Sequence, residues 1–211
     1  MQKPASVYSL DLVLHPEHDT AYRHFEDAFA NPSWRTGRVH LGFRQAFDVI
    51  RPRLDATLAR LTPGRTLWFC GHSLGAALAT LAADHYVGTR GVCTLGSPRV
   101  GDPVFARAFD AKLSGRSLRY VNGNDLVTRV PPPIGYKHVD LGRFIAADGS
   151  VSSGVPALAH VSDGPDGEPG GMFEVIDGLS SGTLASASTL LLDHMPKAYA
   201  IWMWNDYHAN K

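Results

Sequence analysis

The stretch LWFCGHSLGAALATLAADHY, residues 67–86, joins a short apolar segment to an alanine-rich one through a serine between two glycines. The apolar residues before Gly71 fit a buried strand, and the run that begins at Leu74 has the small and apolar residues of a packed helix. A serine at such a strand-to-helix junction, in the pattern G-x-S-x-G, is typical of a nucleophile held on a strained turn with its hydroxyl exposed. The alternative interpretation of Ser73 is an incidental serine in a glycine-rich turn. Both glycines of the pattern are expected to prevent side-chain collisions at the turn.

The composition predicts a single globular domain over residues 1–211, because 44% of the residues are hydrophobic and only 19% are charged. The 20 basic and 20 acidic residues cancel. No excess of either sign therefore points to nucleic acid or to an anionic membrane. No apolar run approaches the roughly 20 residues of a membrane-spanning helix. The two cysteines, Cys70 and Cys93, are too few for a disulfide framework, and both are expected to be small buried hydrophobic residues.

Strand-like and helix-like segments alternate on both sides of the opening stretch. The sequence predicts strands over residues 6–14, 67–70, 91–98 and 117–121, a flanking hairpin over 136–151, and helices over 17–32, 42–61, 74–87, 103–113 and 196–208. Pro52 is expected to kink or break the second of these helices, and Asp102 is expected to cap the fourth. Alternation of strands and helices is typical of an α/β fold with a mostly parallel sheet covered on both faces, whose reactive site lies at the carboxyl ends of the strands.

A serine nucleophile needs a histidine base and a carboxylate that orients the histidine, in the chain order serine, acid, histidine in this kind of fold. Asp125 is the best candidate for the acid, because it follows the strand SLRYV in the turn NGND. Its alternative role is that of an ordinary turn residue. Asp102 is better explained as a helix cap, and Asp140 lies within the expected hairpin.

Four histidines follow Asp125 and are candidates for the base: His138, His160, His194 and His208. His194 is favoured, because it lies in the turn before the last helix, where a loop can carry it to the strand ends. His138 is only a few residues beyond Asp125 and lies in the expected hairpin, His160 borders a glycine-rich loop, and His208 is close to the terminus. The backbone amide of Leu74, at the start of a helix, is the expected donor to the oxyanion.

These residues stand in six blocks that resemble the class 3 lipases, the fungal-type triacylglycerol lipases and their bacterial relatives. The blocks, in the order of the family, are VHLGF (39–43), GHSLGAALA (71–79), GSPRVGD (96–102), NGNDLVTRVPP (122–132), YKHVD (136–140) and DHMPKAY (193–199). The resemblance implies an α/β-hydrolase fold with Ser73 as nucleophile, Asp125 as orienting acid and His194 as base. It also implies an ester or acylglycerol substrate, a transient contact with a lipid interface, and no cofactor or metal.

The sequence departs from this family near its beginning. Family members carry an apolar strand that ends in a Phe-Arg-Gly-Thr-like motif, which supplies a second oxyanion donor, and no such motif occurs here. The segment VYSLDL (7–12) resembles the lid that follows that motif, so the chain is expected to be shortened at its N-terminus. The strand that ends at Cys70 would then have an open edge. We expect this edge to be filled by residues 6–14 or, through dimerisation or strand exchange, by a second copy of the chain.

The sequence therefore predicts a serine hydrolase of carboxylic esters, most simply a triacylglycerol lipase or esterase that works through an acyl-enzyme. The alternative is a lipase-fold protein of weak or no activity that binds an acyl ligand or a partner chain. A signal peptide is not visible in the first residues. Localisation is left open, because members of the family are often secreted and the true start of the protein is unknown.

Overall fold

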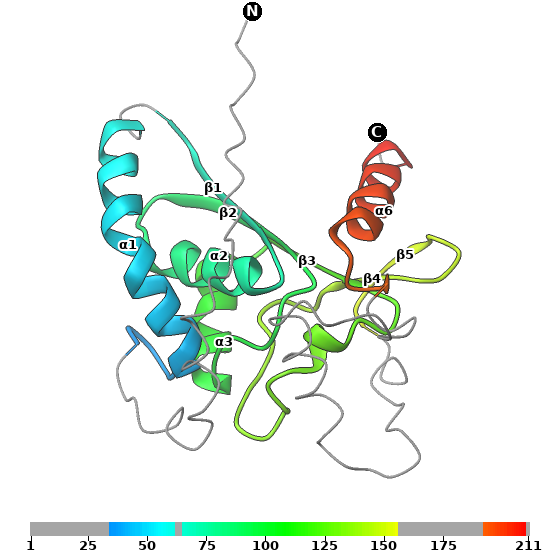
Figure 1. Ribbon diagram of the computed structural model, residues 1–211, viewed down its shortest axis with the longest axis horizontal. Helices are drawn as coiled ribbons and strands as arrows, with labels where there is room; N and C mark the ends of the chain where they lie inside the picture. Colours follow the sequence, from blue (N-terminus) through cyan, green and yellow to red (C-terminus); the bar gives the residue numbers. More distant parts are fainter. Residues whose placement is uncertain (1–33, 62–64, 156–191, 210–211) are drawn as a thin grey trace, which may run out of the picture.

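The computed structural model describes residues 34–61, 65–155 and 192–209. Within them the sheet has five strands in the order β1-β2-β3-β4-β5 (Figure 1). The strands are β1 (Leu67–His72), β2 (Thr89–Leu95), β3 (Ser117–Asn122), β4 (Arg143–Ile145) and β5 (Val151–Ser153). The first four pair in parallel and β5 is antiparallel to β4. The predicted α/β fold with a mostly parallel sheet is confirmed.

Helices cover both faces of this sheet. They are α1 (Leu41–Leu61), α2 (Leu74–His85), α3 (Pro103–Lys112) and α6 (Pro196–Ala209), with a short 3-10 helix η3 (Leu126–Arg129) after β3. Val92 and Cys93 are consecutive in β2, so their side chains point to opposite faces of the sheet. Val92 packs into a cluster with α1, α2 and α3, whereas Cys93 packs into a second cluster with α6. Helix α6 therefore lies on the face opposite α2.

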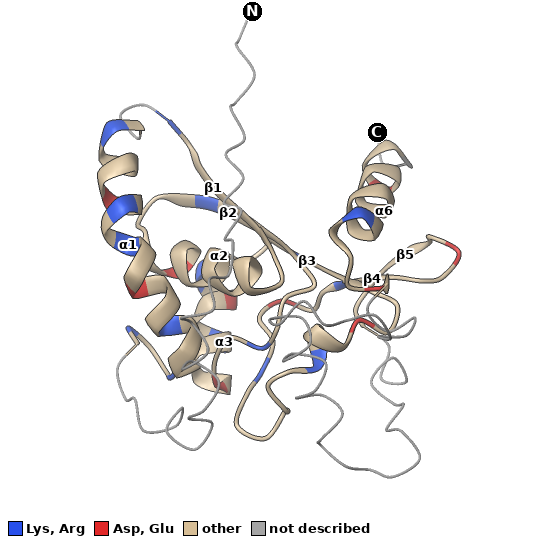
Figure 2. Ribbon diagram, in the orientation of Figure 1, with Lys and Arg blue, Asp and Glu red and all other residues tan. Residues whose placement is uncertain are grey.

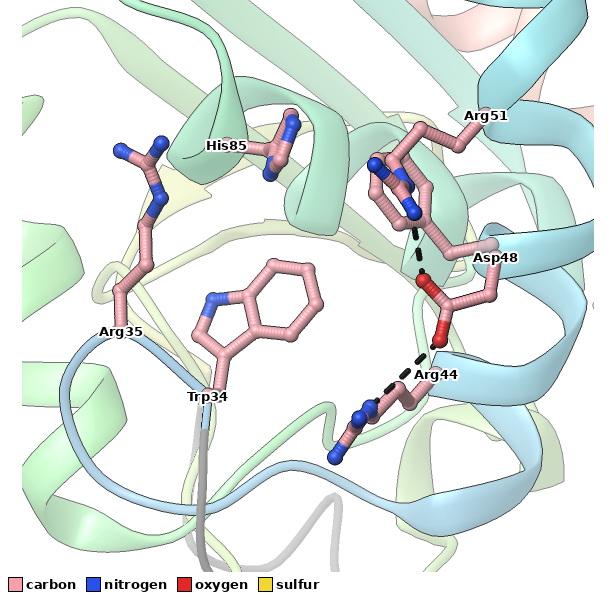
Figure 3. A pocket seen from close by; sticks show the side chains of 7 residues that line it. Trp34, Arg35, Arg44, Asp48, Arg51 and His85 are labelled. Atoms are coloured by element: carbon pink, nitrogen blue, oxygen red, sulfur yellow. Dashed lines mark ion pairs between the residues drawn. The ribbon is translucent and has the colours of Figure 1, made fainter.

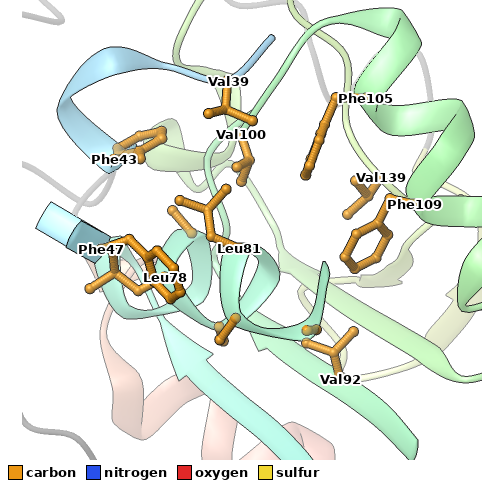
Figure 4. Packing of buried hydrophobic residues seen from close by; sticks show 14 of the residues in the cluster. Val39, Phe43, Phe47, Leu78, Leu81, Val92, Val100, Phe105, Phe109 and Val139 are labelled. Carbon is orange, nitrogen blue, oxygen red and sulfur yellow. The ribbon is translucent and has the colours of Figure 1, made fainter. Parts of the chain in front are cut away.

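Helix α2 is the centre of the larger core, which Figure 4 shows from close by. All its residues from Ala76 to Ala83 are buried. Phe47 of α1, Leu81 of α2 and Phe105 of α3 meet in this core. The alanines of α2 let the neighbouring elements approach closely, so the helix that follows Ser73 is held on every side. Charged residues of both signs are interspersed over the described elements (Figure 2).

Helix α3 begins as the sequence predicts. The Asp102 carboxylate accepts a hydrogen bond from the Phe105 amide at 2.7 Å, and Pro103 is the first residue of the helix. Of the kink or break expected at Pro52, the break does not occur, because α1 runs unbroken for 21 residues with Pro52 inside it. Pro52 removes the hydrogen bond to the Asp48 carbonyl. Both residues are exposed, so water can serve this carbonyl in place of the missing amide.

The flanking hairpin lies further along the chain than predicted. It consists of β4 and β5, joined by the turn that hydrogen-bonds Ala146 to Ser150. The segment before β4 makes one isolated bridge, between Lys137 and Gly101. Asp140, which was placed within the hairpin, precedes it and adopts a φ of 60°. The predicted strand over 6–14 and the predicted helix over 17–32 lie outside the described residues.

Within the described residues, β1 has a strand neighbour on one side only and so forms an edge of the sheet. Its Trp68 side chain is 58% exposed. None of the helices in the described ranges combines the length and apolar character needed to cross a bilayer.

Candidate active site

Ser73 lies on the sharp turn between β1 and α2, at the carboxyl end of the strand. Its φ of 57° and ψ of −127° belong to a region that non-glycine residues rarely adopt. The Ser73 amide donates to the Leu95 carbonyl at the end of β2, at 3.0 Å, and its carbonyl accepts from the amides of Ala76 and Ala77. Strained backbone of this kind persists only where its surroundings fix it, and it clusters at functional sites.

The two glycines beside this serine have different roles. A Cβ atom on Gly71 would lie 2.1 Å from the Gly75 carbonyl oxygen, which leaves no room for any side chain. A Cβ atom on Gly75 would meet nothing within 4 Å. The expectation that both glycines prevent collisions is therefore right for Gly71 and wrong for Gly75, whose backbone, rather than its missing side chain, occupies the tight space.

Asp125 lies three residues beyond the end of β3 and is almost completely buried. One of its oxygens accepts from the Val127 amide at 2.9 Å and caps η3. Both of its oxygens lie 2.9 Å from Nδ1 of His194. The turn role and the pairing with histidine, which the sequence offered as alternatives, are thus filled by the same carboxylate. Since a carboxylate only accepts, Nδ1 carries the proton and Nε2 is left as the basic nitrogen.

The segment that carries His194 is tied to the end of β3 by the residue before it. The Asn122 side chain donates to the Asp193 carbonyl at 2.9 Å, and the Asn124 amide donates to the Asp193 carboxylate at 2.8 Å. Helix α6 starts two residues after His194. Together these contacts fix the histidine over the strand end that presents Asp125.

Tyr199 is a member of the site whose role was not predicted from the sequence. It is fully buried on α6, where its hydroxyl donates to the Asp125 carboxylate and accepts from the Asn122 amide at 3.0 Å. Burial, together with the negative charge of Asp125, raises the pKa of Tyr199 well above its ordinary value. The only sequence signal was its place in the block DHMPKAY, five residues after His194.

His72, the residue before Ser73, contacts His194 directly. The two imidazole rings lie 4.5 Å apart between centroids, and Nε2 of His72 donates to the His194 carbonyl oxygen at 2.7 Å. Burial, and secondly the neighbouring His194, lowers the pKa of His72 below 6.5. His72 is therefore neutral at neutral pH. The contact places the backbone of Ser73, which follows His72 in the chain, beside His194.

Gly96 brings the serine turn and the acid–histidine pair together from another side. It follows Leu95, the acceptor for the Ser73 amide, and has a φ of 58°. A Cβ atom here would lie 2.7 Å from an Asp125 carboxylate oxygen and 3.0 Å from Nδ1 of His194. Within the described residues, no hydrogen bond joins the Ser73 hydroxyl itself to His194. Such bonds are often long in enzymes without substrate and tighten when it binds.

The remaining histidine candidates lie elsewhere. Nε2 of His138 donates a hydrogen bond to the Thr128 carbonyl at 2.7 Å. His208 lies on α6, where its ring contacts Trp204. His160 is outside the described residues. Leu74 is the first residue of α2. An amide at this position has no acceptor inside its helix, so it can donate to an oxyanion.

A cavity of about 200 Å³ lies at the opposite end of α2 (Figure 3). Its lining residues are Trp34, Arg35, Arg44, Phe47, Asp48, Arg51 and His85. The Asp48 carboxylate pairs with Arg44 and with Arg51, each at 3.5 Å. Because α2 has 12 residues, His85 in this cavity is roughly 18 Å from Ser73 along the helix axis. The cavity therefore does not adjoin the candidate nucleophile.

The profile of the family described as Lipase (class 3) matches residues 13–134 of the sequence. The chain belongs to the class 3 lipase family. The chain is 40% identical to the secreted mono- and diacylglycerol lipase 1 of Fusarium solani over 47% of its own length and 32% of the relative's. It is 35% identical to the secreted mono- and diacylglycerol lipase 3 of Gibberella zeae, over 64% of the chain and 46% of the relative. It is 32% identical to the rice phospholipase A1-II 3, over 56% of the chain and 34% of the relative.

Among solved structures, the chain is similar to a triacylglycerol lipase whose catalytic centre is described as a serine protease triad. The TM-score is 0.51 at 27% identity, over 77% of this chain and 59% of the other. The α/β-hydrolase fold is thereby confirmed. The chain spans only about a third to a half of the length of the curated relatives named above.

Proposed function

We propose that this member of the class 3 lipase family hydrolyses carboxylic esters by a Ser73–His194–Asp125 triad. The observation that carries the proposal is the buried pair of Asp125 and His194, joined at 2.9 Å, next to a serine on a strained strand-to-helix turn. Serine, base and orienting acid are the parts that acyl transfer needs, and they occur here in the chain order of the fold.

The geometry supports the following course of reaction. The Ser73 hydroxyl attacks the ester carbonyl while Nε2 of His194 takes its proton, and Asp125 stabilises the resulting imidazolium. The oxyanion accepts from the Leu74 amide at the positive end of α2. His194 then gives its proton to the leaving alcohol, which leaves an acyl-enzyme on Ser73. Water activated by the same nitrogen releases the acid in a second, mirrored step.

An acylglycerol is the substrate class that the relatives favour, since their names describe action on mono- and diacylglycerols, and one is named a phospholipase A1. Hydrolysis of a p-nitrophenyl ester series from acetate to palmitate, with emulsified and soluble diacylglycerol beside it, tests this class. A preference for long acyl chains and for the emulsion supports a lipase that works at a lipid interface. Activity confined to short soluble esters supports an esterase.

A fluorophosphonate probe tests the triad itself, because it reacts only with a serine that a base has activated. The wild type and the Ser153→Ala variant, which changes an exposed serine on β5, are expected to be labelled. The Ser73→Ala and His194→Ala variants are not. A folded wild-type protein that takes up no probe would contradict the proposal and support a lipase-fold protein that binds an acyl ligand or a partner without catalysis.

The edge strand β1 supports a second, separate proposal. Unpaired strand edges recruit another strand, and Trp68 of β1 is exposed on the face of the sheet beside it, with its ring over Gly91. We propose that a second copy of the chain pairs along β1. Sedimentation at increasing concentration is expected to show a dimer that Trp68→Lys weakens. A wild-type monomer throughout that series would exclude the dimer.

A further inference from the structure

The two cysteines of the chain are neighbours across the β1–β2 ladder. Cys70 of β1 and Cys93 of β2 are direct partners in its parallel register. Adjacent strands lie about 4.7–4.9 Å apart, and disulfides join residues whose Cα atoms are roughly 4.4–6.8 Å apart. Since the sequence contains no other cysteine, any disulfide within this sequence must join these two thiols.

Both thiols lie on the same face of the sheet. Paired residues of neighbouring strands share a face, and Cys93 packs on the side of α6. The structure differs here from the expectation that both are buried, because Cys70 is exposed and Cys93 is half-buried. A reagent can therefore reach Cys70 first. The Cys93 thiol stands beside it and is shielded from larger molecules.

We propose that Cys70 and Cys93 form an oxidisable dithiol that closes to a cross-strand disulfide with a small disulfide oxidant such as glutathione disulfide. The Cys70 thiolate attacks one sulfur of the oxidant, forms a mixed disulfide and releases one glutathione thiolate. The Cys93 thiolate then attacks the Cys70 sulfur and releases the second glutathione. Two protein thiols are oxidised, one glutathione disulfide is reduced, and the two thiol protons pass to the two glutathiones.

Closing the bond requires the Cβ atoms to approach to about 3.5–4.5 Å, slightly less than the distance between strands. Adjacent strands already place paired Cα atoms within the range that disulfides span, so closure needs only a local adjustment at these two positions. The disulfide that results is strained and accessible, and bonds of this kind are the ones that reducing agents open readily. The structure therefore assigns a reversible bond to this pair rather than a permanent structural one.

The rate of closure depends on pH. Partial desolvation by the neighbouring protein atoms raises the pKa of the exposed Cys70 thiol, and burial with the neighbouring Cys70 raises the pKa of Cys93 to about 12. Only the thiolate attacks. Closure is therefore expected to accelerate by up to about tenfold for each pH unit between about pH 7 and 9.

The dithiol is connected to the serine turn, and this part of the inference rests on the proposed function. Cys70 precedes Ser73 by three residues, and Cys93 precedes Leu95, the acceptor for the Ser73 amide, by two. Drawing the strands together at this level displaces the turn. A displacement of about 1 Å at a catalytic group can cost on the order of a hundredfold in rate. We expect ester hydrolysis to fall by about tenfold or more on oxidation and to recover with dithiothreitol.

The test uses dilute protein, glutathione disulfide and intact mass spectrometry with peptide mapping. Wild type is expected to lose two hydrogen atoms and to yield a peptide pair linked through Cys70 and Cys93. Cys93→Ser is expected to stop at the glutathione adduct on Cys70. A wild type that also stops at this adduct, or that keeps two thiols open to iodoacetamide at about pH 9, overturns the proposal.

Hydrolysis by oxidised and reduced wild type is measured on the same samples, with Cys70→Ser as the variant that oxidation cannot affect. Closure without a change in hydrolysis contradicts the connection to Ser73. Absence of hydrolysis in every sample contradicts the proposed function and leaves the mass result valid, because that readout needs no activity.

Discussion

The Tyr199 hydroxyl donates a hydrogen bond to the carboxylate of Asp125, and both side chains are buried. The same hydroxyl accepts from the Asn122 amide. Helix α6 thus holds the acid from one side while His194 contacts it from the other. Under the proposed mechanism Tyr199 is a positioning residue, since it contacts Asp125 and would act through it.

Replacing Tyr199 by phenylalanine removes the hydroxyl and leaves the Asn122 amide without its acceptor. The expected loss of unfolding free energy is about 1–3 kcal/mol, the cost of an unsatisfied buried group. We expect kcat for ester hydrolysis to fall severalfold with KM nearly unchanged. Tyr207→Phe, at an exposed position of the same helix, serves as control. Equal kcat in wild type and Tyr199→Phe would contradict a positioning role.

The glycines beside Ser73 are expected to respond differently to alanine. Gly71→Ala would force a Cβ atom to 2.1 Å from the Gly75 carbonyl oxygen, so we expect the turn to distort, with loss of probe labelling and a lower melting temperature. Gly75→Ala meets open space inside a helix, where alanine is favoured by up to about 1 kcal/mol. Thermal unfolding of both variants checks this contrast. Equal damage at the two positions would refute the steric explanation.

Gly96→Ala tests the close approach of the backbone to the acid–histidine pair. Its Cβ atom would press on Asp125 and His194, whereas Gly115, with a similar φ of 67°, has nothing within 4 Å. Both alanine variants suffer the strain of a positive φ, about 1–2 kcal/mol. Only Gly96→Ala is expected to lose activity by more than about tenfold, because it also displaces the pair. The comparison requires kcat and the melting temperature of each variant.

Protonation of His40 is expected to make the free energy of unfolding depend on pH. It is buried, its Nδ1 accepts from the Gly42 amide at the start of α1, and burial lowers its pKa to about 4. The folded state therefore disfavours the charged form of His40. The stability that the neutral side chain contributes is complete above pH 6.5 and is lost as pH falls toward 4. Since one pKa unit is worth about 1.4 kcal/mol, the loss is about 3 kcal/mol.

His40→Asn keeps a side-chain acceptor at this helix start without the titration. Urea unfolding at about pH 7 and pH 4.5 is expected to show a smaller loss of stability on acidification for the variant than for wild type. Parallel losses in the two proteins would assign the acid sensitivity to other groups.

Local signals in the sequence predicted much of this fold. The apolar strands and the helix after Ser73 were found from composition and spacing, and Asp102 was found as a cap because its geometry depends on three residues only. Asp125 and His194 were paired in the prediction because the fold fixes the order of their roles. The hydrogen bond between them agrees with that pairing, and their catalytic roles stay a prediction.

The parts that were missed depend on contacts between distant segments. Tyr199 and His72 join the site because α6 folds back over the end of β3, which no local pattern encodes. The exposure of Cys70 is not indicated by its apolar neighbours in the sequence. Pro52 is expected to kink or break α1, but the helix runs on through it, since water can serve the orphaned Asp48 carbonyl.

The hydrogen bond between Asp125 and His194 joins positions 69 residues apart, and Ser73 comes from a third segment. Under the proposed triad, reactivity at the serine arises only after the chain has closed that long loop. Short pulses of fluorophosphonate at different times during refolding would label only the molecules in which this loop has closed. The labelled fraction at each time would therefore report the rate of the last stage of folding.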